Sequence, residues 1–406
     1  MKVIVVGGSV AGLMIAIALR SIGHEVLVLE RNPTLYLDEQ AAGISLAPYA
    51  QKFVQKLDSL GSHRTELDGI KSTGLTDAGS GRVRQLAPED EVLTTDWTLL
   101  YKKLLSHIST YTEGPGGVIL QTGTEVVDAK LLKNGKWNVI AKLKGDEKAR
   151  FFADLLIGAD GVYSVVRGLV LPDSKPQYAG YLAWRGRFST LNMVVPPEIE
   201  GVRRGELVWV RMLEHYIILY ATQDKVIEWC WYYPYEESSP DLENIMTDIH
   251  GVKHRRIVTP ALLQPHVWEK QLAKTEKDIP TWMRPLLRQC EAPLVTKVIY
   301  FDGTQGTFKE GKLYLVGEAF FTIRPHLGTS CDLAAMQATW LQDLFKDEDM
   351  TFEDWDRRVL QYAAKKARES RNTGLLVMKG QLPEDYEREK DDESDEDDED
   401  DEDYGM

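Results

Sequence analysis

The sequence predicts an α/β protein in which a parallel-sheet domain is interrupted by an antiparallel sheet and followed by C-terminal helices. A strand–turn–helix–strand unit opens the chain, aromatic strand-like segments crowd its middle, and a buried strand followed by a helix returns near residue 312. Alternating strands and helices are typical of parallel sheets, whereas successive short strands favour an antiparallel one. The 406 residues suffice for two or three domains with a large core.

The opening unit has the size and order of a dinucleotide-binding β-α-β fold. Residues 2–7 (KVIVVG) are β-branched and predict a strand, residues 11–22 have helical periodicity, and residues 25–30 (EVLVLE) predict a second strand. The turn between the first strand and the helix reads VGGSVAGL, from Val6 to Leu13. A pyrophosphate would meet the N-terminus of the helix there, where backbone N–H groups are free.

Each residue type in this turn suits that task. Gly7 supplies the tight turn, Gly12 lets the helix pack closely on the strand, and Ser9 stands where the pattern usually has its middle glycine. Ser9 keeps its backbone N–H and adds a hydroxyl for phosphate. Glu30 ends the second strand about twenty residues on, where a carboxylate can accept both ribose hydroxyls of an adenosine.

Two later segments repeat the pattern of a buried strand that breaks into glycine and acid before a helix. They are GADGVYSVVR (158–167) and LVGEAFFTIRPHLGTS (315–330). Such a corner brings a carboxylate, Asp160 or Glu318, to the carboxyl end of the sheet, where ligands bind in open α/β folds. Three corners of this kind in one chain favour a nucleotide site over three ordinary loops.

The segment 178–235 is rich in tyrosine and tryptophan. Residues 207–212, 217–222 and 227–233 predict strands of one antiparallel sheet. Aromatic side chains on alternate strand positions are usually core, but this sheet is also the best candidate for the wall of a site that takes a flat, apolar ligand.

The remaining segments complete the predicted organisation. Helices are expected at 96–107, 260–274, 281–290, 330–345 and 352–376, and further strands at 295–301 and 312–317. We therefore divide the chain into a first part of the parallel-sheet domain (1–177, with a β-rich insertion around 68–90), a β-sheet domain that binds substrate (178–300), the return of the first domain with C-terminal helices (301–380), and a tail (381–406).

The net charge of −15 is concentrated in that tail. Between Glu384 and Asp403 there are 16 acidic and 2 basic residues, so the rest of the chain is close to neutral. The tail has almost no apolar content and is predicted to be disordered. The near-neutral body lacks a basic footprint for nucleic acid, and we interpret the one basic cluster, His254-Arg255-Arg256, as a solvated surface turn.

The cysteines and the N-terminal residues indicate the cellular compartment in which the protein is expected. Cys230, Cys290 and Cys331 are too far apart for a disulfide framework or a CxxC site, which favours a reducing, cytoplasmic compartment. His250 and His254 have metal-ligand spacing but no third ligand, so no metal is expected. The apolar residues 1–19 are interrupted by Gly7, Gly8 and Ser9, and we interpret them as strand and helix rather than as a targeting or membrane segment.

These motifs together resemble the group A flavoprotein monooxygenases, the family of para-hydroxybenzoate and salicylate hydroxylases, over residues 1 to about 345. The fold that this implies is a Rossmann-like FAD-binding domain of the glutathione reductase type with an inserted substrate domain. Within the family the chain resembles the 2,6-dihydroxypyridine 3-monooxygenase branch. The segments that carry this likeness are QAAGIS (40–45), TDWTLLYKKL (95–104), YAGYLAWRG (178–186) and RPH (324–326).

The resemblance implies a role for each matched residue. The ADP half of FAD would be held by the helix start and the acid after the second strand: Ser9, Val10, Ala11, Gly12, Glu30 and Arg31. Gly43 and Ile44 would lie beside the isoalloxazine ring, Asp160 would support the region of flavin and pyridine nucleotide, and Glu318 would face the ribityl chain and pyrophosphate. The pyrimidine edge of the ring would receive backbone N–H groups from Gly328, Thr329 and Ser330, at a helix start that favours an anionic reduced flavin.

The implied reaction has two halves. NADH or NADPH reduces FAD, and dioxygen then forms a C4a-hydroperoxyflavin that hydroxylates an electron-rich aromatic or N-heteroaromatic ring, such as a phenol or hydroxypyridine. A base near the flavin is expected to deprotonate the substrate. His326 is the first candidate, with Tyr220 and Tyr232 as others, and Arg185 could bind a carboxylate or oxyanion. A small aromatic substrate is the expected partner, and the chain is expected to be a monomer or homodimer.

Four positions depart from the family pattern and leave alternatives open. Ser9 replaces a glycine, Glu318 an aspartate, Ser330 a glycine or alanine, and Trp97 an arginine that often contacts FAD. The alternatives are another FAD oxidoreductase on the same scaffold (an epoxidase, a Baeyer–Villiger-type oxygenase or a reductase) and a degenerate FAD fold that binds without catalysis.

Overall fold

A largely parallel sheet of six strands organises the half of the molecule that contains the N-terminus. The computed structural model describes residues 1–34, 42–59, 68–70, 73–77, 83–86, 92–110, 116–191, 194–203, 205–223, 226–346 and 350–380. The order of the sheet is β19-β20-β12-β1-β2-β8, and only the β19–β20 pair is antiparallel. The strands are β1 (Lys2–Val6), β2 (Glu25–Leu29), β8 (Gly117–Gln121), β12 (Leu155–Gly158), β19 (Thr307–Phe308) and β20 (Leu313–Leu315).

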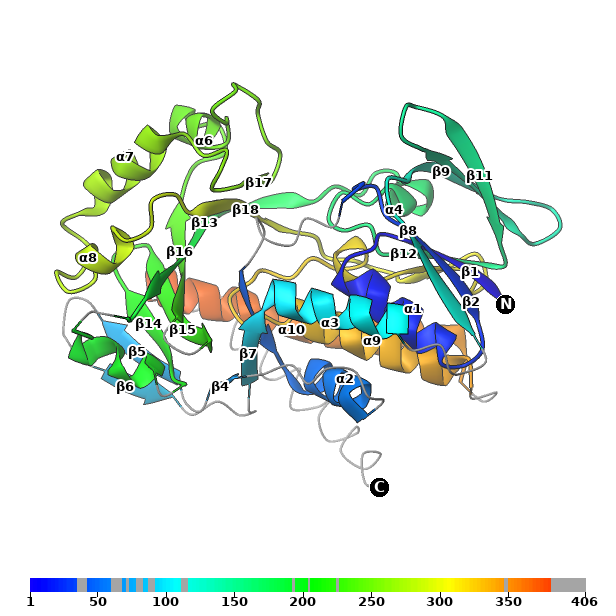
Figure 1. Cartoon of the computed structure of the whole chain (residues 1–406), viewed down its shortest axis with the longest axis horizontal. Coiled ribbons are helices and arrows are strands. Elements are labelled where there is room, and N and C mark those ends of the chain that lie inside the picture. Colours follow the sequence, from blue (N-terminus) through cyan, green and yellow to red (C-terminus); the bar gives the residue numbers. More distant parts are fainter. Residues whose placement is uncertain are drawn as a thin grey trace.

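A layer of helices covers one face of this sheet. The first of them, α1 (Val10–Arg20), is buried along almost its whole length because it consists of small and apolar residues. It packs against α9 (Ser330–Leu344) and α3 (Trp97–Thr110), and α9 packs against α10 (Phe352–Lys379). The long helices lie beneath the parallel sheet in Figure 1.

A three-stranded antiparallel sheet stands at the far end of this half. Its strands are β9 (Glu125–Leu131), β10 (Trp137–Lys142) and β11 (Lys148–Ala153), joined by two short turns that contain Gly135 and Gly145. Val139 and Ala141 alternate inward from β10 and join the same hydrophobic core as β1 and α1. A short helix, α4 (Val165–Val170), follows β12 beneath this sheet.

The other half is built on an eight-stranded sheet with the order β17-β18-β13-β16-β15-β14-β5-β6. Its longest strand, β13 (Gln177–Ser189), pairs with β16 on one side and β18 on the other. The other strands are β5 (Thr73–Asp77), β6 (Val83–Leu86), β14 (Leu207–Arg211), β15 (Tyr216–Gln223), β16 (Val226–Pro234), β17 (Ile257–Val258) and β18 (Leu294–Tyr300).

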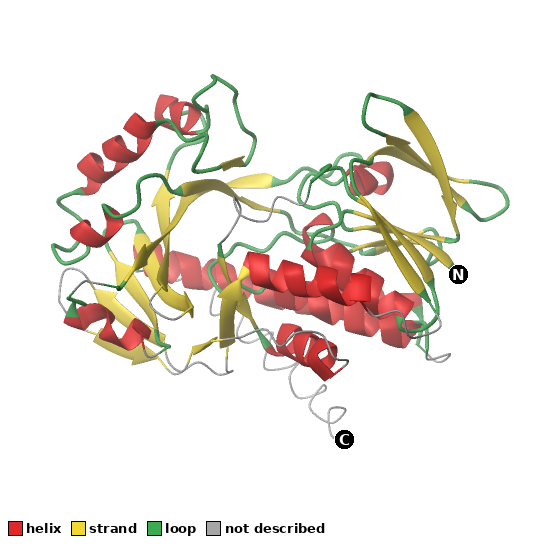
Figure 2. Ribbon diagram, in the orientation of Figure 1, coloured by secondary structure: helices red, strands yellow, loops and turns green. Residues whose placement is uncertain are grey.

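The two faces of this sheet have different environments, because side chains alternate along each strand. Trp184, Trp229 and Trp231 point to one face, where they pack with Trp268 in a core closed by the outer helices. Tyr181 and the tyrosines beside it point to the other face, toward α10 and the parallel-sheet half. Figure 2 shows the outer helices on the far side of this sheet. The helices are α6 (Pro240–Ile245), α7 (Pro265–Thr275), α8 (Arg284–Leu287) and, near β14, α5 (Glu200–Arg203), preceded by the 3-10 turn η1 (Pro197–Ile199).

A small sheet connects the two halves. It has the order β3-β7-β4, with β3 (Gly43–Leu46), β7 (Val92–Asp96) and β4 (Asp68–Ile70), and β15 contacts both β7 and β4. Helix α2 (Pro48–Ser59) follows β3 and packs on α9.

The structure confirms the predicted fold class, an α/β fold with a parallel sheet and an antiparallel one. Within the predicted insertion, residues 73–77 and 83–86 form strands that extend the large sheet, where β5 pairs with β14 in parallel and with β6 in antiparallel orientation. The predicted acidic tail, 381–406, and Gln40 and Ala41 of the QAAGIS segment lie outside the described residues. The predicted domain boundaries stay a proposal. No helix in the described part of the chain is long and apolar enough to cross a membrane.

Candidate cofactor and substrate site

The turn between β1 and α1 requires glycine at both positions that the sequence singles out. Gly7 has a φ of +104°, and a Cβ there would lie 2.3 Å from the carbonyl oxygen of Ala159. A Cβ at Gly12 would lie 1.9 Å from the carbonyl oxygen of Gly7. The first turn of α1 is thereby drawn against β1 and β12, with its N-terminus open.

Ser9 begins α1 as its N-cap residue but its hydroxyl makes no capping hydrogen bond, and the residue is exposed. The first turn of the helix contains no acidic side chain. The N-terminal N–H groups and the Ser9 hydroxyl are therefore available to an anion.

Glu30 is buried and its carboxylate is held in place by the backbone. One oxygen accepts a hydrogen bond from the N–H of Gly8 at 2.8 Å, and the other accepts from the N–H of Asn32 at 2.8 Å. Tyr101, which sequence analysis passed over, donates to the carbonyl of Gly8 at 2.9 Å. The end of β2 and the turn before α1 are thereby fixed relative to each other.

A cavity of about 320 Å³ runs along this turn. Trp97, in the place of the family arginine, stacks on Tyr101 with ring centroids 4.7 Å apart and forms part of the wall. The residues that line the cavity also include Gly7, Gly8, Ser9, Glu30, Arg31, Asp160, Tyr163 and Arg256.

Asp160 caps the start of α4. Its carboxylate accepts hydrogen bonds from the Ser164 hydroxyl and from the backbone N–H groups of Val165 (2.6 Å) and Val166 (3.1 Å). Burial raises the pKa of Asp160, although these hydrogen bonds oppose the rise. The carboxylate therefore organises the motif as well as lining the cavity.

Arg167, at the end of the same motif, is a residue whose contacts the sequence did not reveal. Its guanidinium donates to the carbonyl of Ala319 at 3.0 Å and to that of Val162, and it lies 4.2 Å from the ring centre of Phe301. It thus ties the second motif to the third.

The third motif, residues 315–330, also packs against the first turn of α1. Gly317 opens a 3-10 turn, η2 (Gly317–Ala319), with a φ of +56°, and a Cβ there would lie 2.7 Å from the Cβ of Ala11. Gly328 has a φ of +68°, and a Cβ there would lie 2.7 Å from the Cβ of Ser45 in β3, next to Gly43 and Ile44. The structure therefore brings the residues matched to α1, β3, η2 and the start of α9 around one region. At that start, Thr329 is buried and Ser330 is exposed.

Glu318 makes a contact that the sequence did not predict. Its two carboxylate oxygens accept hydrogen bonds from Arg256 at 2.8 and 2.7 Å. Burial would raise the pKa of Glu318, but the Arg256 guanidinium lowers it below its usual value. Arg256 belongs to the cluster that we interpreted as a solvated turn, yet its side chain is largely buried.

The other two members of that cluster, His254 and Arg255, also contact neighbouring side chains. His254 contacts the carboxylate of Asp248 at 2.8 Å, and the Arg255 guanidinium lies 3.9 Å from the ring centre of Tyr163. The cluster therefore spans from the antiparallel sheet to the wall of the cavity.

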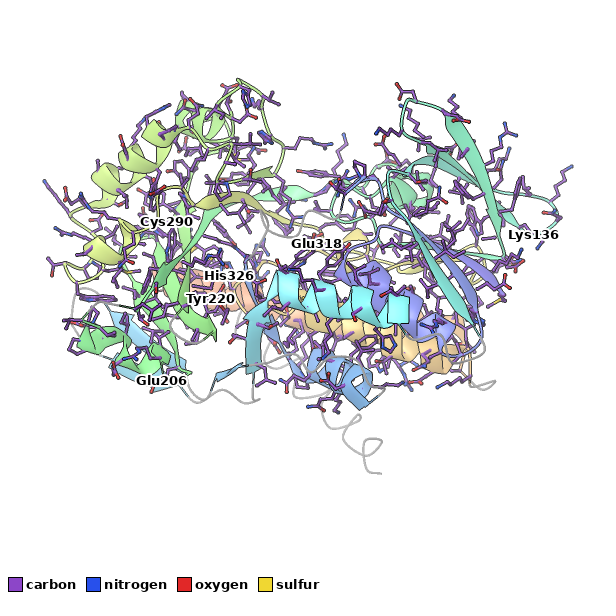
Figure 3. All side chains as sticks on the ribbon, in the orientation of Figure 1. Lys136, Glu206, Tyr220, Cys290, Glu318 and His326 are labelled. Carbon is purple, nitrogen blue, oxygen red and sulfur yellow. The ribbon has the colours of Figure 1, made fainter. Side chains whose placement is uncertain are left out.

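The side chains of Tyr220 and Arg185 point from the antiparallel sheet toward this region. Tyr220 donates to the carbonyl of Gly43 at 3.1 Å, and a Cβ at Gly43 would lie 2.2 Å from the Tyr220 ring. Arg185 lies opposite Cys230 in the sheet, and its Nε is buried with no hydrogen-bond partner among the described residues. Figure 3 shows Tyr220 and Glu318 in the space where the two halves meet.

The same face carries a buried carboxylate that sequence analysis missed. Glu228 of β16 lies opposite Arg187 in β13 and opposite Tyr220 in β15. Burial raises its pKa to about 7. An acid on alternate positions with Cys230 and Tyr232, inside an otherwise apolar strand, is the signal that could have identified it.

His326 is fully enclosed. Its Nε2 lies 2.6 Å from the Tyr181 hydroxyl, its Nδ1 is hydrogen-bonded to the Tyr216 hydroxyl, and its ring packs on Gly374 of α10. Burial, with a smaller contribution from Arg324, lowers the pKa of His326 to about 3. Tyr232 donates to the carbonyl of Pro325 in the same loop, at 3.3 Å.

The residues present fit a dinucleotide cofactor. The glycine turn admits no side chain, the helix start is uncapped and free of acids, and a held carboxylate stands at the ribose end. These features provide the donors and the space that a pyrophosphate and an adenosine ribose need.

Comparison with known proteins agrees with this geometry. The family model for the pyridine nucleotide-disulphide oxidoreductases matches residues 2–55, and the FAD binding domain-like model matches residues 178–300. The chain is similar to FAD-dependent monooxygenases in sequence and in fold, and FAD is its cofactor.

Two individual relatives are monooxygenases that act on aromatic or heteroaromatic compounds, as their names state. The chain is 28% identical to 2,6-dihydroxypyridine 3-monooxygenase of Paenarthrobacter nicotinovorans over 375 residues, which is 89% of this chain and 87% of that protein. It is 31% identical to 3-amino-4-hydroxybenzoate 2-monooxygenase of Streptomyces cremeus over 189 residues, slightly less than half of either chain.

Solved structures have the same fold. The structure of 2,6-dihydroxypyridine-3-hydroxylase from Arthrobacter nicotinovorans superposes with a TM-score of 0.78 and 25% identity, over 94% of both chains. Klebsiella pneumoniae HpxO, solved with FAD and uric acid, superposes with a TM-score of 0.70 and 17% identity, over 92% of this chain and 89% of that one.

Proposed function

We propose that this protein is a monooxygenase that hydroxylates an aromatic or N-heteroaromatic ring, of the phenol or hydroxypyridine kind, with NADH or NADPH and dioxygen. One observation carries the proposal. Tyr220 presents its phenol against β3, and Arg185 presents its guanidinium on the same face of the antiparallel sheet. The likeness to a dihydroxypyridine monooxygenase over most of both chains supports the same substrate class.

FAD, when bound and reduced, activates dioxygen for insertion into the ring. The protein has to orient the substrate, exclude water and take up the proton of its hydroxyl group. We propose that Arg185 stabilises the substrate oxyanion, because its Nε has no partner within the described chain and a guanidinium is always charged.

The proton-transfer role is assigned to Tyr220 together with Glu228. Tyr220 lies beside the β3 carbonyl of Gly43, and Glu228 lies directly across the sheet from it. A carboxyl group with a pKa of about 7 can accept and release a proton at neutral pH. Arg187, which is exposed, lies on the other side of Glu228 and marks the side from which solvent could exchange the proton.

His326 remains a candidate catalytic residue from the sequence, and its contacts support a positioning role. Both ring nitrogens are engaged by Tyr181 and Tyr216, and a pKa of about 3 keeps the ring neutral. A neutral imidazole that donates from one nitrogen and accepts at the other fixes two tyrosines at once. The cytoplasmic location predicted from the cysteines remains part of the proposal.

The test is the reaction itself. Purified full-length protein is incubated with NADH or NADPH, isotopically labelled dioxygen and a panel of phenols and hydroxypyridines, and products are analysed by mass spectrometry. We expect coenzyme oxidation that a panel member accelerates and a product that carries one labelled oxygen on its ring. Coenzyme oxidation without labelled product from any member would reject ring hydroxylation.

Variants then test the residue roles. Tyr220→Phe and Arg185→Gln should retain FAD absorbance but lower kcat/KM at least about tenfold, since each removes a group that touches the substrate. Tyr233→Phe is the matched control, because Tyr233 lies on the same sheet but on the face away from β3. Equal activity of Tyr220→Phe and Tyr233→Phe would remove Tyr220 from the mechanism.

A further inference from the structure

The backbone of Arg256 belongs to the antiparallel-sheet half, but its guanidinium binds Glu318 in the parallel-sheet half. It directly precedes β17, and its carbonyl accepts a hydrogen bond from the N–H of Lys297 in β18 at 2.8 Å. From this fixed position the side chain reaches Glu318 through two parallel hydrogen bonds. Figure 3 shows Glu318 near the centre of the molecule, where the two halves meet.

The pair stands at the start of α1. Gly317, the neighbour of Glu318, comes close enough to Ala11 in the first turn of α1 that no side chain would fit between them. Arg256 lines the same cavity as Gly8 and Ser9. The geometry therefore places this guanidinium at the site where the open helix N-terminus would bind a diphosphate.

A bound pyrophosphate would need a cation in this cavity. The pyrophosphate of FAD carries negative charge on both phosphates. Among the described residues that line the cavity, the cations are Arg31 and Arg256, and Arg31 follows Glu30 at the ribose end. Of these two cations, Arg256 is the one that binds η2, which packs against the first turn of α1.

The Nε–H of Arg256 is also available to a ligand. Both terminal nitrogens bind Glu318, whereas Nε is buried without a hydrogen-bond partner in the described structure. A buried donor without an acceptor is unfavourable, and an anionic oxygen in the cavity would satisfy it. The two-point contact with Glu318 fixes the plane of the guanidinium and hence the direction of the Nε–H.

We propose that Arg256 is an FAD-binding residue that donates to the pyrophosphate and that Glu318 orients it. The antiparallel-sheet half then supplies a cation to the cofactor site. The departure at Glu318 follows from the same arrangement, because a glutamate extends one methylene farther toward Arg256 than the aspartate usual in the family.

The test compares ligands that differ by one phosphate. FAD is titrated into flavin-free full-length protein and followed by its fluorescence, and ADP and AMP are used as competitors. Arg256→Gln should weaken FAD and ADP about tenfold to hundredfold, the loss expected for a charged hydrogen bond, and AMP less than about threefold. Arg256→Lys, which retains the charge without the planar fork, should fall between wild type and Arg256→Gln.

Two further variants separate binding from a purely structural link between the halves. Glu318→Gln removes the carboxylate that orients the guanidinium but leaves the cation itself, so ADP affinity should fall less than in Arg256→Gln. Arg255→Gln, altered next to Arg256 at a side chain that stacks on Tyr163, should leave the ratio of ADP to AMP affinity unchanged.

The opposite results overturn the proposal. If Arg256→Gln weakens AMP as much as ADP, or if Arg256→Gln and Glu318→Gln lose ADP equally, the ion pair serves only to join the two halves. An Arg256→Gln protein that fails to fold gives no affinity ratio, and Arg256→Lys, checked by circular dichroism, then decides: a wild-type ADP affinity in that variant overturns the proposal, and a selective loss of ADP supports it.

Discussion

The hydroxyl of Tyr220 donates to the carbonyl of Gly43, and the ring of Tyr220 occupies the space that any side chain at position 43 would need. One strand of the small connecting sheet is thereby fitted to one strand of the large antiparallel sheet. The contact joins the strand expected beside the isoalloxazine ring to a residue proposed to touch the substrate.

This relationship predicts the effect of Gly43→Ala. The new Cβ would lie 2.2 Å from the Tyr220 ring, so β3 or the tyrosine has to move. We expect a loss of about 1–3 kcal/mol in the free energy of unfolding and a displaced flavin absorption band. Gly117→Ala is the matched control: Gly117 also lies in a strand, and nothing lies within 4 Å of its new Cβ. Equal unfolding midpoints for the two variants would contradict the close fit.

The second prediction concerns Gly374, where replacement of a helical glycine by alanine should destabilise the protein instead of stabilising it. Gly374 lies inside α10, where Gly→Ala ordinarily stabilises by up to about 1 kcal/mol. Here the Cβ would lie 2.4 Å from Nε2 of His326 and would disturb its contacts with Tyr181 and Tyr216. We expect Gly374→Ala to destabilise the protein by about 1–3 kcal/mol, measured by urea unfolding.

Gly168→Ala provides the comparison for this change. Gly168 is exposed in α4, and its Cβ would meet nothing within 4 Å, so propensity alone should act and the variant should be at least as stable as wild type. If both variants gain stability, His326 has more room than its contacts indicate.

The local geometry of the first motif could be predicted from the sequence for a physical reason. A strand–turn–helix corner is local, so the spacing alone places Gly7 and Gly12 in the tight turn where the structure has them, and their role in binding the cofactor stays a prediction. The family resemblance extended this to β3 and the start of α9. The predicted bounds of most helices and strands also agree with the structure to within a few residues.

The interpretation of Arg256 failed because its partner is distant in the sequence. Nothing local to His254-Arg255-Arg256 indicates that β17 pairs with β18 and turns this side chain toward Glu318, 62 residues away. Glu228 was missed for a related reason. Its environment comes from Arg187 and Tyr220 on two neighbouring strands, and the pairing register of those strands is set by the whole sheet.

The raised pKa of Glu228 predicts a pH dependence of stability. Burial raises the pKa from 4.5 to about 7; Asp96 adds to the rise, and Arg187 and Arg185 oppose it. Between these values the folded chain holds a proton that the unfolded chain has released. Ionisation of this group therefore lowers stability as pH rises from about 5 to about 8, by about 3 kcal/mol at most.

Glu228→Gln cannot ionise, so its free energy of unfolding should rise relative to wild type over that pH range. Glu236→Gln, at an exposed glutamate after the same strand, should follow the wild-type curve. Urea unfolding at several pH values measures both differences. A Glu228→Gln curve that runs parallel to wild type would mean that Glu228 is ionised throughout and is not a proton acceptor near neutral pH.

The last prediction concerns Ser9, whose hydroxyl begins α1 without capping it. Replacing an N-cap serine or threonine by alanine usually costs about 1 kcal/mol because a capping hydrogen bond is lost. Thr351→Ala should show that cost, since Thr351 accepts from the backbone N–H of Asp354 in a capping box at α10. Ser9→Ala should leave the stability of the flavin-free protein within about 0.5 kcal/mol of wild type, yet weaken FAD about threefold to tenfold, the loss expected for one hydrogen bond to phosphate. Thermal unfolding without flavin and fluorescence titration with FAD separate the two effects. A Ser9→Ala protein that loses stability but binds FAD normally would show that the hydroxyl supports the helix rather than the cofactor.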